Sequence, residues 1–107
     1  KRPAMAEVAA QGCDILVVTD HHPRFEDAAS IRKTLVDAAR FSRPELQIVE
    51  ASPPELAIRE AVALAQPGDS ILWAGPGHQD YRDIRGVRTP YSARQEARDA
   101  LREAGWQ

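Results

Sequence analysis

Residues 14–24 read Asp-Ile-Leu-Val-Val-Thr-Asp-His-His-Pro-Arg, and this stretch decides the fold. The apolar run at residues 15–18 predicts a short strand that is covered on both faces, as in a parallel sheet. Residues 19–24 then place a hydroxyl, a carboxylate, two imidazoles and a guanidinium directly behind the strand. Because open α/β sheets bind ligands at the carboxyl ends of their strands, we expect this loop to contact a ligand.

A second stretch has the same design. Residues 71–74, Ile-Leu-Trp-Ala, predict another strand, and residues 75–79, Gly-Pro-Gly-His-Gln, follow it as a turn. The turn lacks the lysine and the hydroxyl of a Walker phosphate loop, although its glycines let the backbone approach a ligand. On local evidence alone, a plain strand-exit turn is the simpler interpretation. Together the two strand ends predict small-ligand recognition and no catalytic residue, since no nucleophile lies beside a base.

The overall composition restricts the class of protein. A chain of 107 residues supports one domain, and a formal net charge of -2 gives no basic field for nucleic acid. Cys13 is the single cysteine, which rules out an internal disulfide and fits an intracellular protein. No apolar run approaches the roughly 20 residues that cross a bilayer. We therefore expect a cytoplasmic protein that binds neither nucleic acid nor membrane.

Helix and strand patterns alternate along the chain. We first expect a helix closed by Gly12, a strand at 14–19, a helix from Asp27 to about Arg40 and a strand at 46–50. A helix begun by Ser52 and Pro53 and ended at 67–69 follows, and then a strand at 71–74. The chain ends with a hairpin of 81–84 and 87–89 around Arg85-Gly86 and a helix capped by Ser92 and closed by Gly105. This alternation predicts an α/β fold with a mainly parallel sheet flanked by helices and a small C-terminal β-hairpin. Three parallel strands make a thin sheet, so we expect that a first strand precedes residue 1 and is missing from the chain.

Each predicted helix carries an apolar stripe that is expected to face the core. The stripes are Met5, Val8 and Ala9; Ile31, Leu35 and Ala38; Ile58, Ala61, Val62 and Ala65; and Ala93, Ala97, Ala100, Leu101 and Ala104. In the last helix, Gln95 stands three residues after Ser92, which is the spacing of a capping box.

The histidines and the arginine of the first loop leave several interpretations open. His21 and His22 could ligate a metal together with His78, fill a solvated loop, or donate a hydrogen bond to a ligand carboxylate. Arg24 follows a proline that restrains its direction, so its planar guanidinium could hold a carboxylate or a phosphate. The alternative for Arg24 is an ion pair with one of the acidic residues at positions 26 and 27.

The motifs, in this order, resemble the C-terminal domain of the Mur ligases, in particular of the UDP-N-acetylmuramoyl-tripeptide synthetases (MurE). Residues 17–24 are similar to the family's Val-Val-Thr-Asp-Asp-Asn-Pro-Arg pattern, and residues 74–79 are similar to its Ala-Gly-Lys-Gly-His-Glu segment. Residues 1–5 and 91–94 resemble two helix starts of the same domain. The resemblance spans nearly the whole chain, so it implies one domain at residues 1–107, a Rossmann-like fold and a place in a larger enzyme.

The family resemblance implies an ATP-dependent amide ligase of peptidoglycan synthesis. Such a ligase activates the D-glutamate carboxyl of UDP-MurNAc-L-Ala-D-Glu as an acyl phosphate, which the amine of a diamino acid then attacks. The C-terminal domain binds the incoming diamino acid and closes over the ATP site, while the central domain holds most of ATP and Mg2+. The implied partners are therefore the diamino acid, ATP, the UDP-MurNAc-dipeptide and the central domain, and the chain alone is expected to be inactive.

The resemblance also assigns the site residues. His22 and Arg24 take the positions that hold the distal carboxylate of diaminopimelate, and Gly75 and Gln79 take those that hold its distal amine. The chain departs from the family pattern at its two adjacent histidines, which replace Asp-Asn, at Pro76, which replaces lysine, and at Gln79, which replaces glutamate. A neutral Gln79 cannot form a charge-assisted bond with an ammonium as a carboxylate does. The retained Arg24 favours meso-diaminopimelate as the amino acid, and L-lysine is the alternative.

Two other functions are compatible with the sequence. One is a stand-alone α/β module that binds a small ligand without ligase activity, and the other is a metal-dependent enzyme built on His21, His22 and His78. The ligase interpretation depends on one geometric expectation. The loop behind the first strand and the glycine turn must face a common cleft, so that both contact the same amino acid.

Overall fold

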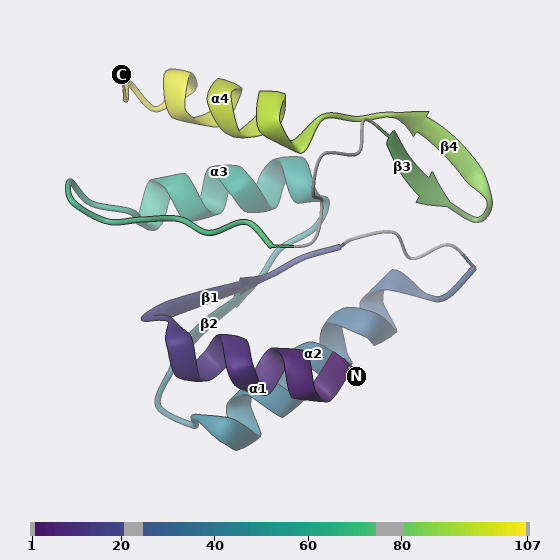
Figure 1. Cartoon of the computed structure of the whole chain (residues 1–107), viewed down its shortest axis with the longest axis vertical. Helices are drawn as coiled ribbons and strands as arrows, with labels where there is room; N and C mark the ends of the chain where they lie inside the picture. The colour runs from purple at the N-terminus through teal and green to yellow at the C-terminus, as the bar shows by residue number, and fades with distance from the viewer. Residues whose placement is uncertain (1, 21–24, 75–80, 107) are drawn as a thin grey trace.

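The computed structural model describes residues 2–20, 25–74 and 81–106, and its elements alternate between helix and strand (Figure 1). In chain order they are α1 (Arg2–Gly12), β1 (Ile15–Val18), α2 (Ala28–Ser42), β2 (Gln47–Glu50), α3 (Pro54–Leu64), β3 (Tyr81–Ile84), β4 (Val87–Pro90) and α4 (Ala93–Glu103). The fold is therefore α/β, with a parallel pair of strands, flanking helices and a small C-terminal hairpin, as the sequence predicts.

The parallel sheet consists of β1 and β2 in the described part of the chain. Ile15 lies opposite Gln47 and Val18 opposite Glu50, and α2 provides the crossover that a parallel pair requires. Helices α1 and α2 lie on one face of this sheet, and α3 and α4 lie on the other (Figure 1). The carboxyl ends of both strands therefore point to the same edge of the domain.

The strand predicted at residues 71–74 is not formed. Leu72 is 91% exposed, and this segment has no regular secondary structure. Trp73 is instead packed against Ile58 and Val62 of α3 and Ala100 of α4. This segment thus contacts the α3–α4 layer through Trp73, while Ile71 and Leu72 are exposed.

The core below the sheet is built from small side chains. Ala6 and Ala10 of α1 are buried against Ala39 of α2, and Leu46 completes the cluster. The predicted inner stripe of α1 is wrong: Met5 and Val8 are 65% and 74% exposed, and Ala9 is exposed as well. The reason is steric, because alanines let two helix backbones approach closely while larger residues would hold them apart.

The stripe predicted for α2 is shifted by one residue. The fully buried residues of this helix are Val36 and Ala39, whereas the predicted Ile31, Leu35 and Ala38 are partly buried. The most buried side of α2 therefore packs against α1, and the predicted stripe lies at the edge of that side.

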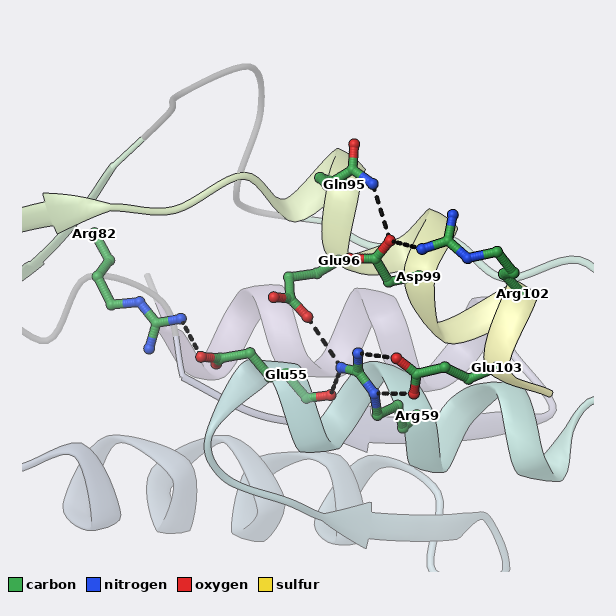
Figure 2. Close-up of polar contacts among 8 residues, drawn as sticks. All are labelled: Glu55, Arg59, Arg82, Gln95, Glu96, Asp99, Arg102 and Glu103. Carbon is green, nitrogen blue, oxygen red and sulfur yellow. Dashed lines mark hydrogen bonds and ion pairs between the residues drawn. The ribbon is translucent and has the colours of Figure 1, made fainter.

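The core above the sheet joins α3 to α4. Ile58 and Val62 pack against Ala100, as predicted, whereas Leu101 and Ala104 of the predicted stripe of α4 are exposed. Arg59 reinforces this packing: its guanidinium donates to Glu103 at 2.8 and 2.9 Å and to Glu96 at 3.0 Å (Figure 2). The two helices are thus held together by an apolar seam and one arginine.

Helix ends follow local sequence signals at α4 but not at α3. Ser92 Oγ accepts a hydrogen bond from Gln95 N at 3.2 Å, and Gly105 has a φ of 88° with Trp106 N donating to Leu101 O, which is a Schellman ending. The side-chain amide of Gln95 donates to Asp99. Helix α3 is predicted to begin at a Ser52 cap, but it begins at Pro54 with Pro53 as its cap residue.

The hairpin turn has the predicted residues in the predicted place. Arg85 and Gly86 have φ angles of 55° and 80°, so both central residues are left-handed, as in a type I′ turn. The ring of Phe25 lies against this turn: a Cβ atom added at Gly86 would be 2.9 Å from Cζ of Phe25. The turn therefore depends on its own left-handed geometry, and the largely exposed Phe25 ring lies beside it. Among the helices of the described residues, none has the length and apolarity that a membrane span requires.

We expect Gly86→Ala to destabilise the domain, because alanine disfavours the left-handed backbone at this position and its Cβ would lie close to the Phe25 ring. The expected loss of unfolding free energy is about 1–2 kcal/mol, measured by urea unfolding. Gly12→Ala is the matched control, since a Cβ there meets no atom within 4 Å. A Gly86→Ala protein as stable as the Gly12→Ala protein would show that the turn accepts a side chain without strain.

Candidate functional site

Asp20, two residues beyond the end of β1, is fixed by two hydrogen bonds. Its Oδ1 accepts from Arg32 Nη1 and its Oδ2 accepts from Ser52 Oγ, each at 2.5 Å. The side chains of Asp20 and Arg32 are only 16% and 15% exposed, so this ion pair is partly shielded from water. Both carboxylate oxygens are engaged, which fixes the direction in which the chain leaves the strand.

Arg32 also reaches the end of the neighbouring strand. Its Nε donates to Glu50 Oε2 at 2.9 Å, and Glu50 is the last residue of β2. The hydrogen bonds that Arg32 donates to Asp20 and, to a lesser extent, to Glu50 raise the pKa of Arg32, so the guanidinium stays charged. A single side chain of α2 thus ties together the carboxyl ends of both parallel strands.

The other flank of the first loop is also held. Both terminal guanidinium nitrogens of Arg2 donate to Glu26, at 2.9 and 2.7 Å, and the hydrogen bond from Arg2 lowers the pKa of that carboxyl. Asp27 accepts from Ser30 Oγ at 2.9 Å. The segment that precedes α2 is therefore attached to the start of α1.

The second loop leads into β3, whose residue Arg82 is bound by two elements. Arg82 Nη2 lies 2.7 Å from Glu55 Oε2 in the first turn of α3, and its guanidinium stacks 4.0 Å from the centre of the Tyr91 ring. Burial raises the pKa of Glu55, but the hydrogen bond and charge of Arg82 outweigh it, so the pKa is lowered overall. Glu55 follows Ser52 by three residues, and the flanks of both loops are consequently tied to residues 52–55.

A shallow, open depression lies beside this contact, between α3, the hairpin and α4. Glu55, Arg82, Tyr91 and Glu96 line it. The hydroxyl of Tyr91 and Oε1 of Glu55 are buried without a hydrogen-bond partner among the described residues. Burial, aided by the charge of Glu55, raises the pKa of Tyr91 to about 12.

The predicted site residues His22, Arg24, Gly75 and Gln79 lie outside the described residues, so their roles stay predictions. The same holds for the other two histidines of the proposed metal site. Among residues 2–20, 25–74 and 81–106, no group of three or more His, Cys, Asp or Glu side chains is placed to hold a metal ion. What the structure adds is the position of one flank of each loop: Asp20 is bonded to Ser52 and Arg82 to Glu55.

Sequence reasoning missed the residues that hold these flanks. Glu50 ends β2 and Asp20 lies just beyond β1, at the same edge of the sheet. Two carboxylates so placed could have predicted a cation shared between them, such as Arg32. The sequence pattern predicts a helix cap at Ser52, although its hydroxyl binds Asp20. The pair of Glu55 and Arg82 has no local spacing that could have revealed it.

Comparisons with known proteins agree on one family. The family described as "Mur ligase, glutamate ligase domain" matches residues 1–77. The chain is 53% identical over 106 residues to the UDP-N-acetylmuramyl-tripeptide synthetase of Leifsonia xyli subsp. xyli, covering 99% of this chain and 21% of that protein. It is 40% identical over 103 residues to the UDP-N-acetylmuramoyl-L-alanyl-D-glutamate--2,6-diaminopimelate ligase of Agrobacterium fabrum, covering 96% of this chain and 20% of that protein.

A solved structure has the same fold over the full length of the chain. It is titled as a UDP-N-acetylmuramoyl-L-alanyl-D-glutamate--2,6-diaminopimelate ligase and matches with a TM-score of 0.82 and 28% identity. The match covers 100% of this chain and 22% of that one. The chain therefore spans about a fifth of the length of the proteins that it matches.

We expect Tyr91→Phe to leave the domain as stable or to stabilise it by about 1 kcal/mol at neutral pH, because it removes a buried hydroxyl without a partner among the described residues. Because the folded pKa of about 12 exceeds the ordinary tyrosine value of about 10, the folded state resists ionisation of Tyr91, and the domain is more stable below pH 10 than at higher pH. This contribution is lost as the pH rises through 12. Tyrosinate absorbance and urea unfolding measure both effects.

The control for this prediction is Tyr81→Phe, which should keep the titration at about pH 12 that Tyr91→Phe removes. Wild type should also lose more stability than Tyr91→Phe between pH 10 and 12. A Tyr91→Phe protein that unfolds more easily at neutral pH would show that the hydroxyl has a partner.

Proposed function

Because this chain belongs to the Mur ligase family, whose glutamate ligase domain it matches over residues 1–77, we propose that it is the C-terminal, amino-acid-binding domain of a larger ligase. The proposed enzyme adds a diamino acid to UDP-MurNAc-L-Ala-D-Glu in peptidoglycan synthesis and uses ATP. Relatives at 40% identity carry names that state 2,6-diaminopimelate as the amino acid, which supports this choice. The proposed domain comprises residues 1–107.

One observation carries the proposal. The flanks of both predicted binding loops are bonded to the same short segment, through Ser52 to Asp20 and through Glu55 to Arg82. Phe25, on the far flank of the first loop, also lies against Gly86 of the hairpin that follows the second. The start of the first loop and the end of the second are thus bonded to one short segment, which suits the two loops to contact one small molecule.

In this proposal the chain binds and orients the amino acid. Arg24 offers its planar fork to the distal carboxylate, with His22 as a further donor. The carbonyl oxygen of Gln79 and the backbone at Gly75 accept from the distal ammonium. The attacking amine is thereby held toward the acyl phosphate, and the neutral Gln79 makes this grip weaker for an ammonium than a glutamate would. meso-Diaminopimelate is thus the proposed substrate, and L-lysine is the second candidate.

The described residues do not by themselves fit ATP and Mg2+. The carboxylates near the sheet edge are already bonded to arginines, Asp20 and Glu50 to Arg32 and Glu55 to Arg82. We therefore assign most of the ATP and Mg2+ contacts to the central domain of the ligase. Closure of this domain over the ATP site belongs to the proposal and draws its support from the family alone.

The decisive test is amino-acid-dependent phosphate release by the whole ligase in the presence of ATP and UDP-MurNAc-dipeptide. We expect release with meso-diaminopimelate, weaker release with L-lysine, and none with the 107-residue chain alone. Binding of an amino acid without phosphate release by the whole protein would favour a stand-alone binding module. Turnover by the 107-residue chain would contradict the proposal that it is only the amino-acid-binding part.

We expect Arg24→Ala in the whole ligase to raise the KM for diaminopimelate about 10- to 100-fold, because a hydrogen bond to a charged group contributes about 1.5–3 kcal/mol. The KM for ATP should stay within about twofold, since Arg24 is proposed to touch the amino acid only. Arg98→Ala, an exposed arginine of α4, is the control and should change neither constant. Equal increases in both constants for Arg24→Ala would show that the assigned role is misplaced.

A further inference from the structure

Residues 52–55 form a short bridge between the flanks of the two predicted binding loops. At one end Ser52 donates to Asp20, which follows β1 and precedes the first loop. At the other end Glu55 pairs with Arg82, which follows the second loop. The bridge itself contains Pro53 and Pro54, and the pyrrolidine rings of two consecutive prolines restrict its backbone. A stiff spacer therefore separates two polar anchors.

Each anchor is held more firmly than an ordinary surface contact. Asp20 is also bound by Arg32, and this pair is mostly shielded from solvent. Arg82 is placed between the Glu55 carboxylate and the face of the Tyr91 ring, which combines an ion pair with a cation–π contact. Both anchors therefore resist small displacements of the flanks that they hold.

We infer that residues 52–55 set the distance between the two amino-acid-binding loops, which makes Ser52 and Glu55 positioning residues of the ligase. This inference rests on the proposed function. Neither residue needs to touch the substrate. A molecule gripped at both ends by two loops is sensitive to their spacing, because small misplacements of binding groups weaken both contacts at once. The spacing should matter for the amino acid and hardly for ATP.

The experiment uses the whole ligase with Ser52→Ala, Glu55→Gln and the double variant. We expect each single change to raise the KM for diaminopimelate about threefold to tenfold, while kcat and the KM for ATP stay within about twofold. Because both variants loosen the same spacing, the double variant should raise the KM by less than the product of the single effects. Ser52→Thr keeps the hydroxyl and should restore the wild-type KM.

Glu103→Gln is the matched control, since Glu103 pairs with Arg59 at the other end of the α3–α4 contact. It should leave the KM for diaminopimelate unchanged, and thermal unfolding should show that every variant is folded. The inference is overturned if folded Ser52→Ala and Glu55→Gln enzymes keep the wild-type KM, if they affect ATP equally, or if Glu103→Gln acts as they do. A wild-type ligase without amino-acid-dependent phosphate release would instead reject the proposed function.

Discussion

The carboxylate of Asp20 is the interaction on which the rest of the arrangement depends. One of its oxygens binds Arg32, which also binds the end of β2, and the other binds Ser52 ahead of α3. One side chain thus connects the first strand to the helix below the sheet and to the helix above it. Loss of Arg32 would leave the carboxylate of Asp20 mostly buried without an opposite charge, which costs more than the pair itself contributes.

Local signals are sufficient to predict much of the fold. The strands β1 and β2, the Arg85-Gly86 turn and the two ends of α4 can be predicted, because each depends on a few neighbouring residues with strong conformational preferences. The inner face of α1 and the segment at 71–74 cannot. In both cases the packing partner decides the outcome: α2 packs against Ala6 and Ala10 of α1, and Trp73 packs against α3 and α4. The structure of these two segments is thus decided by the helices that they pack against and not by their own residues.

The candidate site also has a part that the sequence predicts and a part that it does not. The two strand ends can be recognised from apolar runs followed by polar or glycine-rich loops, and their family pattern names the residues that are proposed to bind the amino acid. The placement of Asp20 and Glu50 at two strand ends could have predicted a shared cation such as Arg32. The contacts of Ser52 with Asp20 and of Glu55 with Arg82 cannot be recognised, because these residues meet only after the sheet and the α3–α4 layer have formed. Long-range ion pairs leave no periodic trace in a sequence.

The two cores on opposite sides of the sheet have a mechanical consequence. Each core is a tightly packed helix pair, while the sheet between them has two strands of four residues in the described part of the chain. The compliant region of such a body is its middle, so bending under load would rotate one rigid half against the other. The hydrogen bond between Ser52 and Asp20 links the two sides at the sheet edge, so it opposes this rotation.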